Sequence, residues 1–177
     1  MIMARTLLAA ALLVVDAGAQ TKRLPQPGAP YVPSPQSVVD AMLELAHVTP
    51  TDVVYDLGSG DGRIPITAAL RYGARGVGIE IEKRLVDESI TTARRAGVSH
   101  LVTFVHGDLF EADITPATVI AIFLLPRMNQ ELVPKFRRDL RPGARIVTHG
   151  YDLGPSWPPP EETRDIGGLM IHLWTIK

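Results

Sequence analysis

A strand, a glycine-rich turn and a helix follow one another in the stretch VVYDLGSGDGRI at residues 53–64. Three β-favouring residues lead into Asp56, and glycines stand at positions 58, 60 and 62 before the chain becomes apolar again. Glycine allows backbone angles that other residues avoid and lets another molecule approach the main chain closely. A turn alone needs one glycine, so three in alternation predict a turn that is shaped around a ligand.

Strand and helix patterns alternate along the rest of the chain. Short apolar runs are typical of buried strands, and between them apolar residues recur at helical spacing. We expect helices over residues 35–48, 64–72, 83–96 and 128–140, and strands from residue 53 and over residues 76–80, 101–108, 118–124 and 144–150, with a C-terminal hairpin. This alternation predicts an α/β fold, a mainly parallel sheet with helices on both faces and an antiparallel edge strand.

The chain has 177 residues, of which 46% are hydrophobic, and this suffices for one core and one domain. Residues 1–19 contain Arg5 followed by an apolar run at 7–15, a pattern typical of a signal peptide or a membrane anchor. Residues 20–34 are rich in proline and predict an extended linker. We place the folded domain at residues 35–177.

The charges limit the partners and the chemistry. The formal net charge is -1, with acids and bases interspersed, so no strong field draws the chain to nucleic acid, and we expect no nucleic acid partner. The chain has no cysteine, which removes disulfides, thiolate nucleophiles and cysteine zinc sites. No spacing of histidines and acids matches a metal site, so we predict no bound metal.

The glycine turn favours a cationic ligand over a phosphate. In a parallel sheet, ligands bind beyond the carboxyl ends of the strands, where this turn lies. A dinucleotide motif GxGxxG would need a third glycine at Arg63, so that pattern fails. Asp56 and Asp61 flank the glycines, and their carboxylates would repel a pyrophosphate. We therefore expect a ligand that carries positive charge or an amine.

These residues resemble a known family. DLGSGDGR is similar to the nucleotide-binding motif of class I S-adenosylmethionine-dependent methyltransferases, whose cofactor has an amino acid moiety and a sulfonium but no phosphate. The resemblance implies a Rossmann-like, seven-stranded fold and S-adenosyl-L-methionine as the cofactor. It also implies roles for acids at the strand ends: Asp56 near the methionine end of the cofactor, Glu80 on the ribose hydroxyls, and Asp108 with Leu109 at the adenine. Gly58, Gly60 and Asp61 complete the implied cofactor site.

Each of these residues also has a purely structural interpretation. Asp108 could form a turn with Gly107, Glu80 could end its strand in solvent, and Asp61 could cap the helix that follows. All of them fall at strand ends on one edge of the expected sheet, and this favours a shared site.

The flanking segments indicate a subfamily. PYVPS at 30–34, FLLPRMNQEL at 123–132 and the Trp-Pro loop after the GARIV strand resemble small protein-lysine methyltransferases related to the mitochondrial enzyme that modifies the c subunit of ATP synthase. An NPPY-type sequence, expected of enzymes that methylate adenine or glutamine nitrogens, is absent at 123–126. The resemblance therefore implies a protein substrate with an accessible lysine.

Methyl transfer to lysine needs a neutral amine in line with the donor. The amine has a solution pKa near 10.4, and an apolar or aromatic pocket lowers it. Four aromatic residues fall near the expected cofactor edge, and we predict that the acceptor channel is drawn from Tyr31, Phe123, Tyr151 and Trp157. No general base is evident, because His106 and His149 lie in or near strands, where histidines are usually structural.

Three alternatives stay open at this point. The chain could methylate a small molecule or another group on a protein, or it could be a cofactor-binding module without activity. The amino-terminal segment suggests export or membrane anchoring, while the cofactor is made inside cells and favours the cytoplasmic side. The sequence does not set the oligomeric state.

Overall fold

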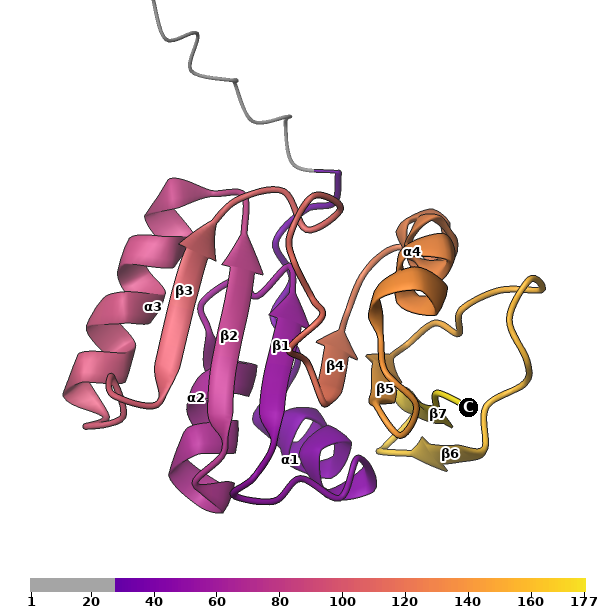
Figure 1. The fold of residues 1–177 in the computed structure, drawn as a ribbon. Helices are drawn as coiled ribbons and strands as arrows, with labels where there is room; N and C mark the ends of the chain where they lie inside the picture. The colour runs from indigo at the N-terminus through magenta and orange to yellow at the C-terminus, as the bar shows by residue number, and fades with distance from the viewer. Residues whose placement is uncertain (1–27) are drawn as a thin grey trace, which may run out of the picture.

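A computed structural model describes residues 28–177, which form one α/β domain (Figure 1). The helices are α1 (Gln36–Leu45), α2 (Arg63–Tyr72), α3 (Lys83–Arg95) and α4 (Pro126–Asp139), and the strands are β1 (Val53–Leu57), β2 (Arg75–Glu80), β3 (Val102–His106), β4 (Val119–Ile122), β5 (Arg145–His149), β6 (Glu162–Asp165) and β7 (Met170–Thr175). The signal or anchor predicted at residues 1–19 lies outside the described residues.

The seven strands form one sheet in the order β3-β2-β1-β4-β5-β7-β6. Strands β1 to β5 pair in parallel, and β7 pairs antiparallel with both β5 and β6. The order reverses between β1 and β4, so the loops that follow these two strands diverge and leave a crevice. The predicted fold class is confirmed. The antiparallel strand β7 lies one place inside the edge, because the chain first forms β6 at the edge and then returns as β7 between β6 and β5.

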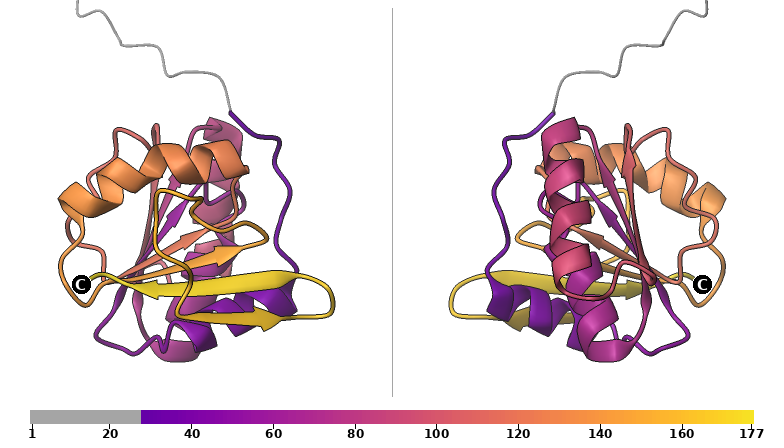
Figure 2. Two further views of the ribbon diagram at one scale, coloured as in Figure 1. Left: turned by 90° about the vertical axis from the view of Figure 1, so that its right-hand side faces the viewer. Right: turned by 90° about the vertical axis from the view of Figure 1, so that its left-hand side faces the viewer.

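The two faces of the sheet carry separate cores (Figure 2). Strand β1 is buried at every position, and its side chains alternate between the faces. Tyr55 and Leu57 pack with α4, whereas Val54 packs with α1 and α2. Helix α3 covers β2 and β3, where Ala93 packs with Ile66 of α2. Helices therefore cover both faces, as the alternation predicted.

Helix α3 begins at Lys83 as expected, and the other three helices begin one or two residues from their expected starts. Helix α4 begins at Pro126 rather than 128, because proline is well suited to the first helical turn and Leu125 before it is extended. Helix α1 is preceded by Pro35, and no side chain caps it. The hydroxyl of Ser34, directly before Pro35, bonds to His149 instead of to this helix.

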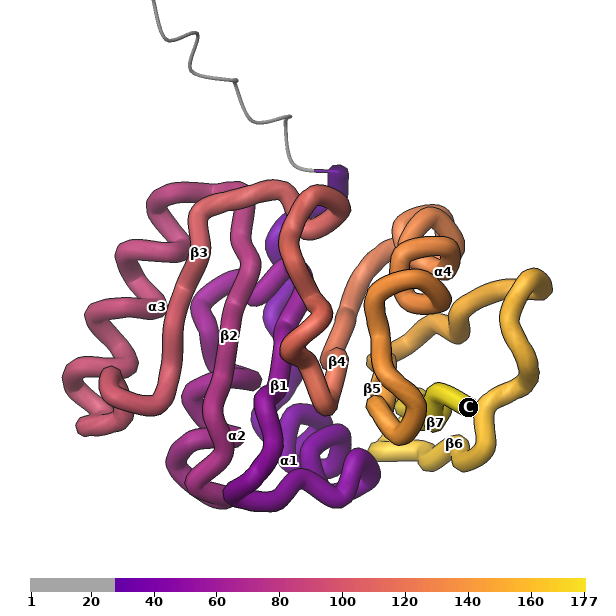
Figure 3. The backbone as a smooth tube through the Cα atoms, viewed as in Figure 1, coloured from indigo at the N-terminus to yellow at the C-terminus, as the bar shows by residue number. Residues whose placement is uncertain are grey.

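Residues 28–34, called the strap below, approach the domain and run toward α1 (Figure 3). The strap has no regular secondary structure, yet Ser34 is buried. This part of the predicted linker is held to the domain by two hydrogen bonds, one between the Ser34 hydroxyl and His149 and one from Arg63 to the Ser34 carbonyl. Within residues 28–177, no helix is long and apolar enough to cross a membrane.

A polar clamp joins the amino ends of three strands, opposite the crevice. Asp52, just before β1, forms an ion pair with Arg145 at the start of β5 and accepts a hydrogen bond of 2.6 Å from the Thr118 hydroxyl beside β4. Thr49 donates its amide and its hydroxyl to the same carboxylate. Burial alone would raise the pKa of Asp52, but these hydrogen bonds and Arg145 lower it below its usual value. Asp52 is therefore charged in the folded protein near neutral pH, and this charge stabilises the fold.

Replacing Asp52 with Asn should lower the free energy of unfolding by about 2 kcal/mol near neutral pH, because Arg145 loses its partner. A depressed pKa stabilises the fold above the unfolded value of about 3.9, and that stability is lost as pH falls through the folded pKa. The difference in the free energy of unfolding between the Asp52→Asn protein and the unchanged protein should therefore become smaller in acid. Urea unfolding at several pH values measures it, and Asp87→Asn, at an exposed pair with Lys83, is the control with little effect.

Candidate active site

The glycine turn after β1 folds back onto the end of β2. The amides of Gly58 and Ser59 both donate to the carbonyl of Ile79, at 2.9 and 3.0 Å, and the amide of Gly60 donates to Oε2 of Glu80 at 2.8 Å. A phosphate site needs free amides that point at the ligand. These amides are already used within the protein, which agrees with the prediction that the ligand is not a phosphate.

Glu80 ends β2 and is buried with both carboxylate oxygens in use. Oε2 accepts from Gly60, and Oε1 accepts from the amide of Glu82 at 2.8 Å. Each carboxylate oxygen can accept a second hydrogen bond. Glu80 is therefore fixed in position and still able to accept bonds from a pair of hydroxyls, and it is not the solvated strand end that was the alternative.

Asp56 lies in β1 and is buried without a side-chain hydrogen bond to any of residues 28–177. Burial raises its pKa well above the usual value, and the nearby charges of Glu80 and Asp61 raise it further. A buried carboxylate is costly unless a cation pairs with it. This position therefore fits a ligand that brings an ammonium group.

A cavity of about 270 Å³ opens between the glycine turn, the strap and the loops that follow β2, β3 and β4. We call it the first cavity. All of the predicted site residues except Tyr151 and Trp157 line it: Tyr31, Asp56, Gly58, Gly60, Asp61, Glu80, Asp108, Leu109 and Phe123. Their individual roles stay predictions. Among residues 28–177, no cluster of three or more histidines and acids is placed to hold a metal.

The glycines serve the site in different ways. A side chain at Gly58 would meet Leu124 at 3.0 Å, at a positive φ of 86°. At Gly60 the missing side chain leaves room for the ring of Tyr31, which would lie 2.5 Å from an added Cβ. Gly62 lies outside the first cavity and makes room for Phe104 of β3. The three alternating glycines therefore allow close packing around the turn as well as access for a ligand.

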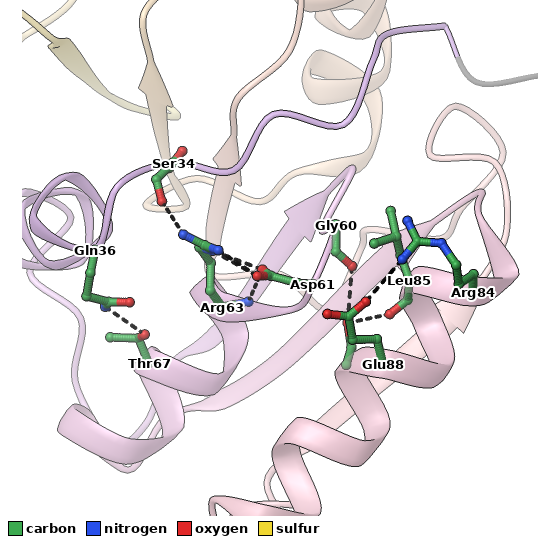
Figure 4. A network of polar contacts seen from close by, with 10 residues as sticks. Ser34, Gln36, Gly60, Asp61, Arg63, Thr67, Arg84, Leu85 and Glu88 are labelled. Atoms are coloured by element: carbon green, nitrogen blue, oxygen red, sulfur yellow. Dashed lines mark hydrogen bonds and ion pairs between the residues drawn. The ribbon is translucent and has the colours of Figure 1, made fainter.

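Arg63 ties the strap to the turn (Figure 4). Its guanidinium donates to the carbonyl of Ser34 at 2.7 Å and forms a two-pronged ion pair with Asp61, at 2.9 and 2.6 Å. Burial would raise the pKa of Asp61, but the bonds from Arg63 lower it below its usual value. Asp61 therefore remains charged. Its Oδ1 also accepts the amide of Arg63 at 3.3 Å, at the first residue of α2, although the cap position itself is Gly62.

Asp108 makes the local turn that the alternative interpretation expected. Its Oδ1 accepts the amide of Phe110 at 2.9 Å. The same residue lines the first cavity next to Leu109. The turn thus places Asp108 at the rim, and the two interpretations are compatible.

A second cavity of about 460 Å³ adjoins the first. The two share Val32, Pro33 and Phe123 as lining residues. His149, Tyr151 and Leu169 are among the other residues of the second cavity, and no lysine, arginine or acid lines it. Val32, Tyr151 and Leu169 are exposed, so a side chain from another molecule can reach the second cavity.

Trp157 lies away from both cavities. Its ring packs edge-on against Phe136 of α4, with ring centres 6.4 Å apart, and Arg137 lies over it at 5.0 Å. Trp157 lines neither cavity because its ring packs on α4, and its predicted role at the acceptor stays a prediction. Tyr151, in the loop after β5, lines only the second cavity.

Sequence reasoning missed the connections made by Ser34, Arg63 and His149. The Ser34 hydroxyl and Nδ1 of His149 lie 2.8 Å apart in a buried hydrogen bond between the strap and the end of β5. Ser34 directly precedes Pro35, a pair typical of a helix start, and a histidine in or near a strand is usually structural. Because 115 positions separate Ser34 and His149 in the chain, no local pattern links them. The signal in the sequence was that each lies beside a segment linked to the cofactor.

Comparison with known proteins identifies this arrangement. Residues 56–161, from Asp56 through the turn, α4 and β5, match the model of the ANTKMT methyltransferase domain. The chain belongs to the ANTKMT methyltransferase family. It is an S-adenosylmethionine-dependent methyltransferase with the class I fold, and the predicted cofactor and enzyme class are confirmed.

Relatives of this methyltransferase include proteins with named acceptors. A protein-lysine N-methyltransferase of Saccharolobus islandicus (strain REY15A) is 43% identical over 82% of this chain and 91% of the relative. A lysine N-methyltransferase of the ATP synthase c subunit, from Xenopus laevis, is 35% identical over 73% of this chain, which spans only 56% of that relative. A structure described as an RNA methyltransferase from Salinibacter ruber, in complex with S-adenosyl-L-homocysteine, is 54% identical, with a TM-score of 0.80 over 82% of this chain and 94% of that one.

The first cavity of this methyltransferase fits the cofactor by its chemistry. Asp56 offers an unpaired buried carboxylate to the amino group, and Glu80 offers two fixed oxygens to the ribose hydroxyls. Leu109 and Leu124 offer apolar contact, and no cationic side chain of the cavity is available for a phosphate because Arg63 is paired.

Glu80→Ala should weaken the binding of S-adenosylhomocysteine roughly 10- to 150-fold, through the loss of about 1.5 to 3 kcal/mol of charge-assisted hydrogen bonds. Isothermal titration calorimetry measures this change. Glu88→Ala, on the exposed side of α3, is the matched control and should leave the affinity unchanged. Equal affinities for the Glu80→Ala protein and the unchanged chain would remove Glu80 from the cofactor site.

The affinity for S-adenosylhomocysteine should rise as pH increases above the ordinary aspartate pKa of about 3.9, by at most about tenfold per unit. The raised pKa of Asp56 leaves part of the free protein protonated in acid, and the ligand ammonium needs the charged carboxylate. Asp61 is already charged over this range, because Arg63 lowers its pKa. The Asp56→Asn protein should bind S-adenosylhomocysteine more weakly near neutral pH, and its affinity should no longer change with pH. If the affinity of this variant still rises with pH, a group other than Asp56 causes the change.

Proposed function

We propose that this enzyme transfers a methyl group from S-adenosylmethionine to the side-chain amino group of a lysine in a protein substrate. The names of the archaeal and vertebrate relatives support this acceptor. The observation that carries the proposal is the second cavity, an uncharged space with aromatic walls that opens to solvent and shares Phe123 with the cofactor cavity. A lysine side chain has the shape and the apolar stem to enter such a space.

The protein contributes mainly positioning and desolvation to this reaction. S-adenosylmethionine supplies the methyl group on a positively charged sulfur. Holding the acceptor nitrogen in line with that group provides much of the acceleration. The rings of Phe123 and Tyr151 remove water from the approaching amine, which lowers its pKa, and their faces favour the methylated ammonium that forms.

RNA is the second candidate acceptor, because the relative of 54% identity is described as an RNA methyltransferase. RNA binding depends on lysines and arginines that contact phosphates. The first cavity contains five carboxylates, from Asp56, Asp61, Glu80, Glu82 and Asp108, against Arg63 alone, and the second cavity contains no charged side chain of Lys, Arg, Asp or Glu. This distribution favours a cationic acceptor over a polyanion.

We also propose that the domain works on the side of a membrane where S-adenosylmethionine is made. The apolar run at residues 7–15 supports attachment to a membrane, and the need for the donor supports this orientation.

Labelling separates the two acceptors directly. The full chain is incubated with S-adenosylmethionine carrying a radioactive methyl group, together with bacterial protein extract or with total bacterial RNA. We expect label in protein, recovered as methyllysine after acid hydrolysis, and none in RNA. Label in RNA that is removed by ribonuclease would contradict the lysine proposal, and Gly58→Val, which fills cofactor space beside Leu124, is the inactive control.

A further inference from the structure

We propose that His149 accepts the proton that the acceptor lysine must lose before it is methylated. This inference rests on the proposed lysine acceptor and adds a general base to a site for which the sequence indicated none.

The position of His149 suits this role. It ends β5 and lines the second cavity, which adjoins the cofactor cavity through Val32, Pro33 and Phe123. A lysine that reaches the cofactor through the second cavity therefore passes the imidazole ring. Of the other histidines on strands, His106 bonds the carbonyl of Ile81 and His172 bonds Thr163, and neither lines a cavity.

The ring of His149 is held on two sides. Nδ1 lies 2.8 Å from the Ser34 hydroxyl, and the carbonyl of Ser34 is itself fixed by Arg63. Phe123 stacks on the imidazole, with ring centres 3.9 Å apart and planes inclined by 32°. When Nδ1–H donates to the hydroxyl of Ser34, Nε2 is left with a free lone pair, and it has no hydrogen-bond partner within residues 28–177.

The surroundings keep the imidazole neutral before reaction. Burial lowers the pKa of His149 below its usual value. The elements packed against His149 carry several titratable groups. They are Tyr31 of the strap, Asp40 and Glu44 of α1, Arg63 of α2, Tyr151 in the loop after β5 and His172 of β7. A neutral imidazole can take a proton, and the ring face of Phe123 then stabilises the imidazolium.

The proposed reaction accounts for each proton and electron pair. One N–H bond of the lysine ammonium breaks and its proton bonds to Nε2 of His149, which leaves a neutral amine and an imidazolium. The amine lone pair then forms the N–CH₃ bond as the bond between methyl and sulfur breaks, and its electron pair stays on sulfur. The products are a methylated ammonium, neutral S-adenosylhomocysteine and an imidazolium that returns its proton to water.

The test compares His149→Asn with His172→Asn, a matched change at the histidine outside both cavities. Asparagine can keep an amide donor toward Ser34, so the strap contact is retained. Initial rates of methyllysine formation in bacterial protein extract are measured from about pH 6 to about pH 10. Thermal melting and S-adenosylhomocysteine binding check that each variant folds.

We expect the His149→Asn rate to fall about a hundredfold near pH 7 and to approach the unchanged rate near pH 10, where lysine loses its proton to solvent. The His172→Asn protein should follow the unchanged profile. A deficit of equal size at every pH, or no deficit, would overturn the proposal. Failure of the unchanged chain to form methyllysine would instead overturn the proposed function.

A second measurement does not depend on turnover. Nitrogen-15 NMR of the histidine rings in the full chain should show His149 neutral near pH 7, with its proton on Nδ1. Ser34→Ala should raise the fraction of the Nε2–H form, because the partner of Nδ1–H is lost. A ring that carries its proton on Nε2 in the unchanged chain would contradict the proposal, since that nitrogen could not accept a proton.

Discussion

The carboxylate of Glu80 is the contact on which the rest of the site depends. It holds the glycine turn through Gly60 and the start of the next loop through Glu82, so the backbone on both sides of the cofactor position is fixed by one side chain. Glu80 occupies the amide of Gly60, and the carbonyl of Ile79 occupies those of Gly58 and Ser59, so these amides are not free to attract a phosphate. Asp56 lies buried nearby, and its carboxylate has no hydrogen-bond partner among the described residues. A fold shared with dinucleotide-binding proteins thereby becomes selective for a ligand with hydroxyls and an ammonium group.

The strap joins the cofactor site to the acceptor side. Arg63 bonds both Asp61 and the strap carbonyl of Ser34, and the Ser34 hydroxyl bonds His149. The two cavities meet along this line of contacts, at Val32, Pro33 and Phe123. The proposed donor and acceptor positions therefore share one connected group of residues, as in-line transfer requires.

Local patterns predicted most of the fold, because the parallel strands and their helices follow one another in the chain. Asp56, Glu80 and Asp108 could be assigned from sequence because each stands at a strand end, and the topology brings those ends together. Trp157 and the pair of Ser34 with His149 could not, since their positions depend on how irregular segments fold back. The proline-rich loop packs on α4 and Phe136, and the strap packs on the domain, through contacts between residues far apart in the chain.

The most direct test of this account is a crystal structure of the full chain with S-adenosylhomocysteine. The account predicts the ribose hydroxyls on Glu80, the amino group beside Asp56, and the sulfur directed toward Phe123, where the second cavity begins. A ligand whose sulfur points away from Phe123, or one bound without Glu80, would contradict it.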